Sequence, residues 1–227
     1  MKTLRNLLTI GMIGLASLLP NKSEAELNFS LDSNSSSKYM FFGMPFSNGN
    51  INQTMLNMNK GDFTGTLWGN YDVKQGKLNE VDVFADYARS INKLNLSLGA
   101  IYFIAKVDDD WVDCVDWHAG INASAPLNPS LNYHKFTGAD NGDYTELGIS
   151  KNFTVNKRVM ITTSGKIGYN NGAFRDKKGL SHLEGNLKVP IRFSKKLNVA
   201  PNINCSKALG EDLKNAIWGG VNVHYNF

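Results

Sequence analysis

Apolar and polar residues alternate with a period of two along most of the chain after Glu26. In residues 63–71, for example, the odd positions carry Phe, Gly, Leu, Gly and Tyr, whereas the even positions carry Thr, Thr, Trp and Asn. This period predicts β-strands with one apolar and one polar face, and no helical period persists over a useful window. Clear strands are predicted at 63–71, 80–87, 94–102, 115–123, 145–153, 159–169, 183–191, 197–205 and 217–227, and weaker ones at 27–31, 55–58 and 131–133.

The connections between these segments alternate between short turns and long polar loops. Short turns are predicted at 59–61, 90–93, 126–129, 155–157 and 194–196. Long loops are predicted at 33–50, 72–79, 105–113, 137–143, 170–179 and 207–214. This alternation is typical of an up-and-down antiparallel β-barrel that spans an outer membrane, with the short turns on the periplasmic side. The sequence therefore predicts an all-β transmembrane barrel of about twelve strands.

Aromatic residues stand at the strand ends on the apolar face, which separates a membrane barrel from a soluble sandwich. Such residues form two girdles at the membrane interfaces of outer-membrane barrels. Closure of the barrel also satisfies every backbone hydrogen bond in hydrocarbon. The predicted girdle consists of Phe63, Tyr71, Tyr87, Tyr102, Phe153, Tyr169, Tyr225 and Phe227.

Two prolines conflict with this picture. Pro190 and Pro201 fall inside predicted strands, where a closed barrel has no free edge to tolerate a missing N–H group. A bulge, or a strand shorter than the alternation indicates, would accommodate them.

Residues 1–25 have the pattern of a cleaved signal peptide. Lys2 and Arg5 precede a short apolar stretch at 7–19, and Ser23-Glu24-Ala25 provides a small-x-small cleavage site. The mature barrel is then expected at 26–227, exported to the outer membrane. Its last strand ends on Phe227 and resembles the C-terminal strand that the barrel-insertion machinery reads, so that machinery and outer-membrane lipid and lipopolysaccharide are the expected partners.

Charge and cysteine content narrow the function further. The 24 basic and 20 acidic residues nearly balance, and three of the basic ones lie in the predicted signal peptide, so no nucleic-acid partner is expected. Cys114 and Cys205 show no metal-ligand spacing, and a disulfide between them would join non-neighbouring strands. No cofactor is expected, and the oligomeric state is left open.

Charged residues on the polar face are expected to line the lumen. Acidic and basic strands would lie across a twelve-stranded barrel from each other, which would create a transverse field for polar solutes. The alternative is that these side chains pair with neighbours in a nearly closed lumen. The pore-lining candidates are Asp82, Asp86, Asp116, His118, Lys166, His182, Glu184, Lys188 and Arg192.

Catalytic and metal sites find little support. Asp116 and His118 share a face and could hydrogen-bond along a strand, but no nucleophile motif accompanies them, so no enzyme is predicted. The acidic run at 108–110, with Asp113 and Asp116 nearby, lacks the spacing and glycine of a calcium loop. Arg175, Lys177 and Lys178 form a basic loop that could meet lipopolysaccharide phosphates.

Three stretches resemble the TorF-type porins of Gram-negative bacteria, a family of small barrels. Residues 37–43, Ser-Lys-Tyr-Met-Phe-Phe-Gly, followed by Ser47, are similar to the family pattern Ser-x-Tyr-x-Phe-Arg-Gly-x-x-x-Ser. Phe42 stands at the arginine position, so no role of that charge carries over. Residues 80–87 and 144–148 resemble two later strands, and the resemblance extends to about Phe153.

The resemblance implies a porin-like role without an assigned substrate. Together with the alternation, it predicts an outer-membrane channel for passive diffusion of small polar solutes. The alternatives are a structural or adhesive protein that acts through its outer loops and, with less support, an outer-membrane enzyme.

Overall fold

A computed structural model describes residues 25–107 and 110–227 of the chain. The signal peptide predicted at 1–25 falls outside these residues except for Ala25, as do Asp108 and Asp109 of the acidic run. Among the described residues, no helix is long and apolar enough to cross a bilayer.

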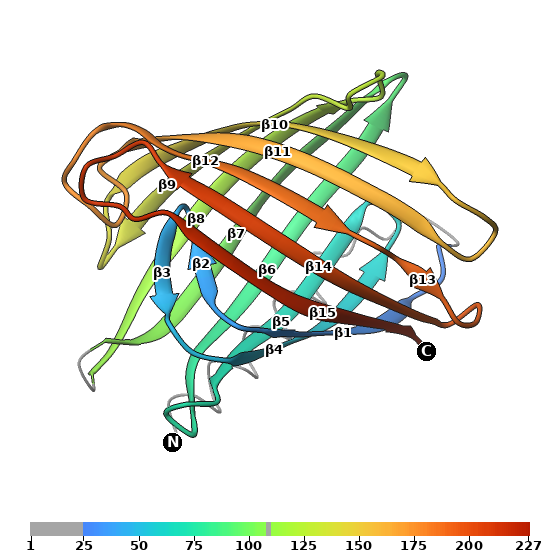
Figure 1. The fold of residues 1–227 in the computed structure, drawn as a ribbon, viewed down its shortest axis with the longest axis horizontal. Helices are drawn as coiled ribbons and strands as arrows, with labels where there is room; N and C mark the ends of the chain where they lie inside the picture. Colours follow the sequence, from blue (N-terminus) through green and yellow to red (C-terminus); the bar gives the residue numbers. More distant parts are fainter. Residues whose placement is uncertain (1–24, 108–109) are drawn as a thin grey trace.

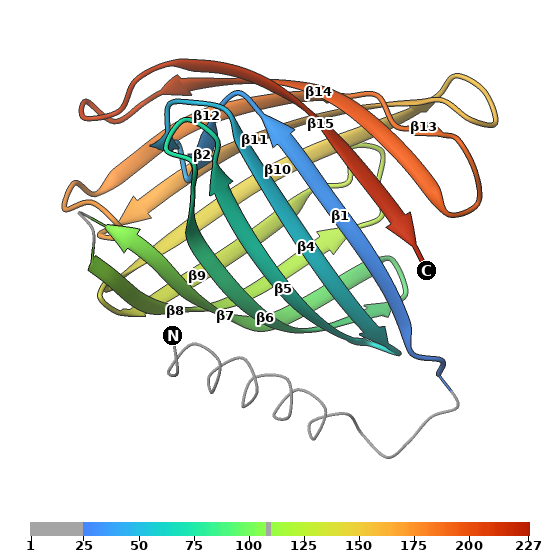
Figure 2. The ribbon, with the colours of Figure 1, turned by 90° about the horizontal axis from the view of Figure 1, so that it is seen from below.

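The described chain forms fifteen β-strands, and the larger of its two sheets closes into an antiparallel barrel (Figures 1 and 2). The first strand pairs with the last, and β12 pairs with β14, so the barrel has twelve positions around its wall. The barrel strands are β1 (Asn28–Ser36), β4 (Ile51–Lys60), β5 (Phe63–Asp72), β6 (Lys77–Ile91), β7 (Leu94–Val107), β8 (Asp110–Ala123), β9 (Ser130–Gly138), β10 (Gly142–Thr154), β11 (Met160–Asn171), β12 (Gly179–Lys188) with β13 (Ile191–Arg192), β14 (Leu197–Ala208) and β15 (Ala216–Asn226). The predicted all-β, twelve-stranded antiparallel barrel is confirmed.

The two ends of the barrel differ in what they carry, and each takes its name from that difference. The terminal end holds the start of β1 and the C-terminal Phe227, and the loop end is opposite (Figure 1). Two predicted loops at the loop end, 105–113 and 137–143, are wrong, because β7 runs to Val107, β8 begins at Asp110, and only residues 139–141 separate β9 from β10. Their acidic residues suggested loops, but a strand that extends beyond the hydrocarbon layer is wet on both faces and tolerates them.

The prolines lie where the wall is irregular. β12 ends at Lys188, and the separate strand β13 begins after Pro190. The ladder with β14 is interrupted at the same height but keeps its register, with Asn202 opposite Lys188 on one side of the gap and Val199 opposite Ile191 on the other. Pro201 occupies the gap and accepts a hydrogen bond from the Val189 N–H at 2.9 Å. The tenth barrel strand therefore ends at Lys188, before the end at residue 191 that the alternation indicated, and this gap accommodates both prolines.

The outer face of the barrel is apolar and exposed, with Leu98 and Ile217 more than half accessible. All eight predicted girdle aromatics point to this face. Tyr71 and Tyr169 lie near the loop end, whereas Phe153, Tyr225 and Phe227 lie at the terminal end. Their contact with membrane interfaces stays a prediction.

The two cysteines are free and lie on opposite faces of the wall. Cys114 of β8 is buried beside Phe103 on the inside, whereas Cys205 of β14 is exposed and pairs in register with the outward Ile217. A disulfide is absent because the two side chains point to different sides of the wall.

Candidate functional site

The interior of the barrel is the candidate site, and its loop end is filled by a hairpin that the sequence did not predict. The connection between β1 and β4 contains β2 (Tyr39–Phe41) and β3 (Met44–Ser47), which pair with each other in a sheet of their own. Both views place this inner hairpin, residues 37–50, inside the barrel (Figures 1 and 2). The prediction of a long polar outer loop at 33–50 is therefore wrong.

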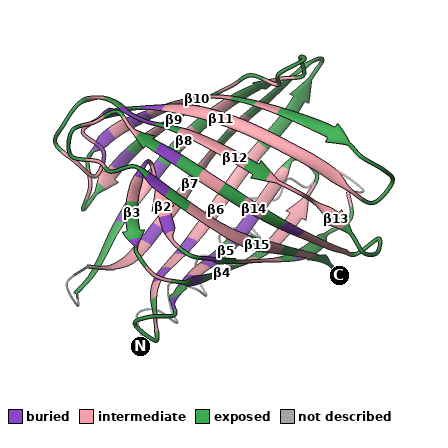
Figure 3. Ribbon diagram, in the orientation of Figure 1, coloured by how far each residue is buried: buried purple, intermediate pink, exposed green. Residues whose placement is uncertain are grey.

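Aromatic side chains pack the hairpin against the wall in two clusters. One joins Tyr39 of the hairpin to Ile51 and Trp68 of the wall. The other places Phe41 and Phe42 against a core that includes Phe136 and Tyr144. The most buried segments gather toward the loop end around these clusters (Figure 3). The loop-end half of the interior is thus a packed core.

A second loop covers the hairpin from outside. Phe174, in the connection between β11 and β12, packs edge-on against Phe41, Phe46 and Phe136. Its backbone N–H donates to the Asp140 carboxylate at 3.0 Å. Burial raises the pKa of Asp140, because removing its charge from water is costly, and that hydrogen bond opposes the rise.

On the inner face of the wall beside the hairpin, carboxylates on one strand pair with histidines on another. His118 of β8 lies 2.7 Å from Asp86 of β6, although β7 runs between these strands. The intervening position is Gly99, where a Cβ atom would lie 2.2 Å from Asp86 Oδ1 and 2.6 Å from His118 Nε2. Asp116 in turn lies 2.7 Å from His134 on β9. The expected contact between Asp116 and His118 is thus replaced by two cross-strand pairs.

The predicted cation Lys166 is neutralised locally. Its ammonium lies 3.0 Å from Glu146 on β10 and 3.7 Å from Glu184 on β12. His182, also on β12, is fully buried and lies 3.0 Å from Ser181 Oγ and 3.4 Å from the Tyr144 hydroxyl. This part of the wall is a network of paired groups.

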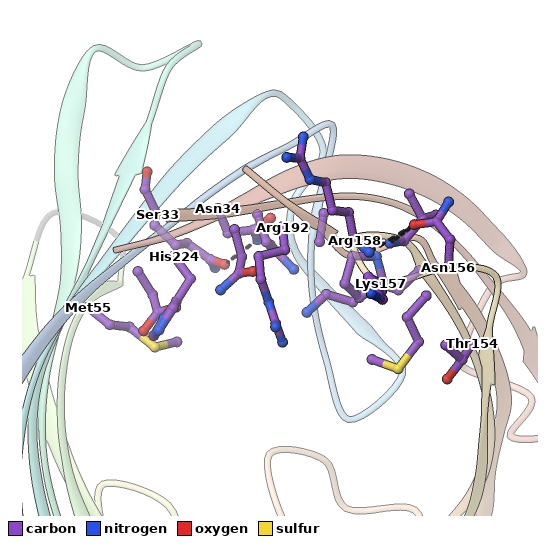
Figure 4. A pocket seen from close by; sticks show the side chains of 18 residues that line it. Ser33, Asn34, Met55, Thr154, Asn156, Lys157, Arg158, Arg192 and His224 are labelled. Atoms are coloured by element: carbon purple, nitrogen blue, oxygen red, sulfur yellow. Dashed lines mark hydrogen bonds and ion pairs between the residues drawn. The ribbon is translucent and has the colours of Figure 1, made fainter. Parts of the chain in front are cut away.

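The terminal-end half of the interior contains a cavity of about 780 Å³. Four cationic side chains line it, and the lining carboxylate, Asp32, lies 2.7 Å from His224. Figure 4 shows the Arg192 side chain extending into this space. Amide and hydroxyl groups and two methionines complete much of the lining. The four cations are Lys157, Arg158, Lys188 and Arg192.

Charge is therefore segregated along the barrel axis as well as around it. Glu80 and Asp82 lie near the start of β6, toward the loop end, with 5 % and 2 % of their surface exposed. Lys188 and Arg192 lie toward the terminal end. The transverse field that the sequence suggested is weakened where Lys166 is paired, and the axial separation was not foreseen.

Sequence reasoning missed several groups of this interior. Glu80 lies on the same polar face as Asp82, and Glu146 lies on the polar face of its own strand. The period of two therefore already indicated that both side chains point inward. Lys157 and Arg158 lie in the turn after β10, where no alternation exists to indicate a direction. Asp32 and His224 belong to the first and last strands, and only closure brings them together.

The part of the chain that the structure describes contains neither a metal centre nor an open catalytic site. Among residues 25–107 and 110–227, no group of three or more His, Cys, Asp or Glu side chains could hold a metal ion. Ser181, His182 and Glu184 lie close together, but the first two are fully buried beneath the hairpin tip. A substrate cannot reach that hydroxyl without displacing the hairpin.

The basic loop at the loop end forms ion pairs with acidic residues of the neighbouring connection. Arg175 pairs with Asp212 at 2.6 Å, and Lys177 pairs with Glu211 at 3.0 Å. These pairs join the connection after β11 to the connection after β14. Contact of this loop with lipopolysaccharide stays a prediction.

No protein-family model and no curated protein matches this chain. Solved structures do resemble it. The KdgM porin has a TM-score of 0.62 at 13 % identity, over 87 % of this chain and 99 % of that one, and it is also described in complex with disordered oligogalacturonate. The NanC porin has a TM-score of 0.57 at 10 % identity, over 87 % and 98 % of the chains.

The COG4313 outer membrane channel from Pseudomonas putida F1 also has a TM-score of 0.57 at 10 % identity, over 91 % of this chain and 97 % of that one. These likenesses show that the chain has the fold of outer-membrane porins and channels.

Proposed function

We propose that this protein is an outer-membrane channel for passive diffusion of small polar solutes, with a preference for anions. In this proposal the signal peptide at 1–25 directs export, and the C-terminal strand ending on Phe227 is read by the insertion machinery. The terminal end faces the periplasm, as the short turns of such barrels do. The resemblance to TorF-type porins supports the same general role.

The cavity at the terminal end carries the proposal. Porin lumens are polar and wet, and rings of Lys or Arg select for anions. Here four cations line the cavity against one carboxylate that already has a histidine partner. An anion that enters this space therefore gains electrostatic stabilisation in a site where low-dielectric walls limit screening.

Single-channel recording in planar bilayers tests the proposal. We expect conductance steps and, under a salt gradient, a reversal potential on the anion side. The paired substitution Lys188→Gln and Arg192→Gln should move that potential toward cations without abolishing conductance, because it removes charge from the cavity and leaves the wall intact.

The matched control removes two cations from the same end of the barrel but outside the cavity. Lys195 and Lys196 lie exposed in the turn before β14, so Lys195→Gln with Lys196→Gln should leave the reversal potential nearly unchanged. Equal effects of the two pairs would reject anion selection by the cavity. Absence of conductance at any voltage, both in the wild type and in a variant that lacks the inner hairpin, would favour the structural or adhesive alternative.

A further inference from the structure

We propose that the inner hairpin is a plug, and that solutes pass only when its tip leaves the wall at Tyr144, Ser181 and His182. This inference rests on the proposed channel function. It assigns a role to the segment at 37–47, the stretch on which the resemblance to TorF-type porins begins.

The hairpin crosses the whole lumen. It arises between β1 and β4, where Ser37 N–H donates to the Gly219 carbonyl and Ser47 Oγ to the Asp72 carboxylate. Its tip residue Phe42 contacts Phe136 of β9, and β9 is six positions from β1 in the order of the twelve barrel strands. A segment that spans the diameter blocks the axis of the barrel.

The tip is a two-residue turn in a strained conformation. Phe41 pairs with Met44, and the residues between them, Phe42 and Gly43, have φ angles of 50° and 82°. Such turns favour glycine or asparagine, and a bulky residue at positive φ is uncommon and costs energy. Strain of this kind persists when surrounding contacts hold it in place.

The wall supplies those contacts. The Phe42 ring stacks on Tyr144 with centroids 3.9 Å apart, and the Phe42 carbonyl accepts a hydrogen bond from Ser181 Oγ at 3.0 Å. Gly43 lies so close to His182 that a Cβ atom would stand 2.5 Å from its Nδ1. This docking site on the wall, formed by Tyr144, Ser181 and His182 and called the dock below, therefore accepts only a glycine at position 43.

The hairpin can leave without opening the barrel. Its two strands form a sheet separate from the barrel sheet, so no ladder hydrogen bond of the wall breaks when the tip moves. An isolated two-stranded hairpin is marginal in water, so its order depends on the dock. These properties describe an element with two states: held against the wall, or released into the lumen.

Release also involves the second loop. Phe174 contacts Phe41 and Phe46 from the loop end, and Asp140 holds the backbone of Phe174. Outward movement of the hairpin must displace this ring, whereas movement toward the terminal-end cavity need not. The geometry thus allows a plug that yields into the cavity.

The experiment compares two glycine substitutions in planar bilayers. Gly43→Ala places a methyl group against His182 at positive φ. Gly76→Ala, in the connection between β5 and β6, meets similar backbone strain at a φ of 65°, but the nearest atom is the Tyr71 hydroxyl at 3.9 Å. We expect Gly43→Ala to raise open probability or conductance several-fold and Gly76→Ala to leave both near the wild-type values.

A deletion keeps the test decisive if Gly43→Ala misfolds. Replacing residues 38–48 by a short Gly-Ser linker removes the plug and retains every barrel strand. Far-UV circular dichroism and heat-modifiable electrophoretic mobility report folding. A several-fold higher conductance of the deletion variant supports the plug. Equal conductance of wild type and deletion overturns the plug and leaves the channel standing, whereas silence of both rejects the channel and the plug together.

Discussion

The ring of Phe42 stacks on the ring of Tyr144 at a centroid distance of 3.9 Å and an interplanar angle of 20°. The two residues lie on opposite sides of the barrel in its strand order, since Phe42 belongs to the connection after β1 and Tyr144 to β10. The contact therefore bridges the lumen. Tyr144 is only 1 % exposed, so the stack is shielded from solvent.

Replacing Phe42 by alanine should loosen the hairpin while sparing the barrel. An aromatic pair contributes about 0.5–1.5 kcal/mol beyond its buried area, and the Phe42 ring also contacts His134 and Phe136, so its removal takes away several contacts of the tip at once. We expect faster tryptic cleavage after Lys38 and an unchanged urea midpoint for the barrel. Phe193→Ala is the control, since Phe193 is 60 % exposed at the terminal end. A protected Lys38 bond in Phe42→Ala would show that the stack does not hold the hairpin.

Adding one methyl group at Gly99 should disrupt the Asp86–His118 pair. The Cβ atom would overlap both partners, and separating these partly buried groups leaves them unsatisfied at a cost of up to about 1–3 kcal/mol. Gly165→Ala, on β11, is the control, because its nearest neighbour is the Glu184 carbonyl oxygen at 3.7 Å. Urea unfolding of the two variants measures the difference, and similar midpoints would show that the wall adjusts.

Removing the charge of Lys166 should destabilise the wall through its neighbours. Lys166→Met leaves Glu146 and Glu184 facing each other without a cation, and we expect a loss of at least about 1–3 kcal/mol, because that is the cost of an unsatisfied buried polar group and charged groups cost more. Adding Glu184→Gln should restore part of that loss, since only one carboxylate then remains. A double variant no more stable than Lys166→Met would contradict this coupling.

Anion preference should weaken as salt concentration rises. The cavity cations act through a field that mobile ions screen, with a Debye length of about 10 Å at 0.1 M salt and about 3 Å at 1 M. We expect the reversal potential under a fixed concentration ratio to shrink between these conditions. A preference that does not change with salt would indicate selection by size.

The stability of the loops around Asp140 should depend on pH. Because burial raises its pKa from the ordinary value of 3.8, folding favours the protonated acid. That stabilisation is fully present below pH 3.8 and is lost as the pH rises through the raised pKa. Asp140→Asn keeps an acceptor for the Phe174 N–H without the charge. Its urea midpoint should exceed that of wild type at neutral pH, with the gap closing on acidification; a gap independent of pH would contradict the assignment.

The wall of the barrel followed from the sequence because its physics is local. One face of each strand contacts an apolar environment outside the barrel and the other faces the interior, so the period of two directly indicates which residues point inward. Asp82, Asp86 and Lys166 were assigned to the polar face in this way, and the structure has them inside. Their roles in permeation stay predictions.

The partners of those residues did not follow, because they depend on register. His118 reaches Asp86 only because Gly99 stands between them, and alternation does not indicate which residues lie opposite each other. The inner hairpin was missed for a related reason. Its strands are three and four residues long, one of them contains Pro45, and nothing in a short segment indicates whether it turns outward or into the lumen.

Asp32 and His224 lie 2.7 Å apart although 192 positions separate them along the chain. They mark the seam where β1 meets β15, the last strand in the order of the described elements. Contacts of such long sequence separation form late, so the barrel stays open until the whole chain is present. Until then β1 and β14 expose unpaired edges that can add foreign strands. A chain that ends before β15 would therefore fail through aggregation, even though every other strand were intact.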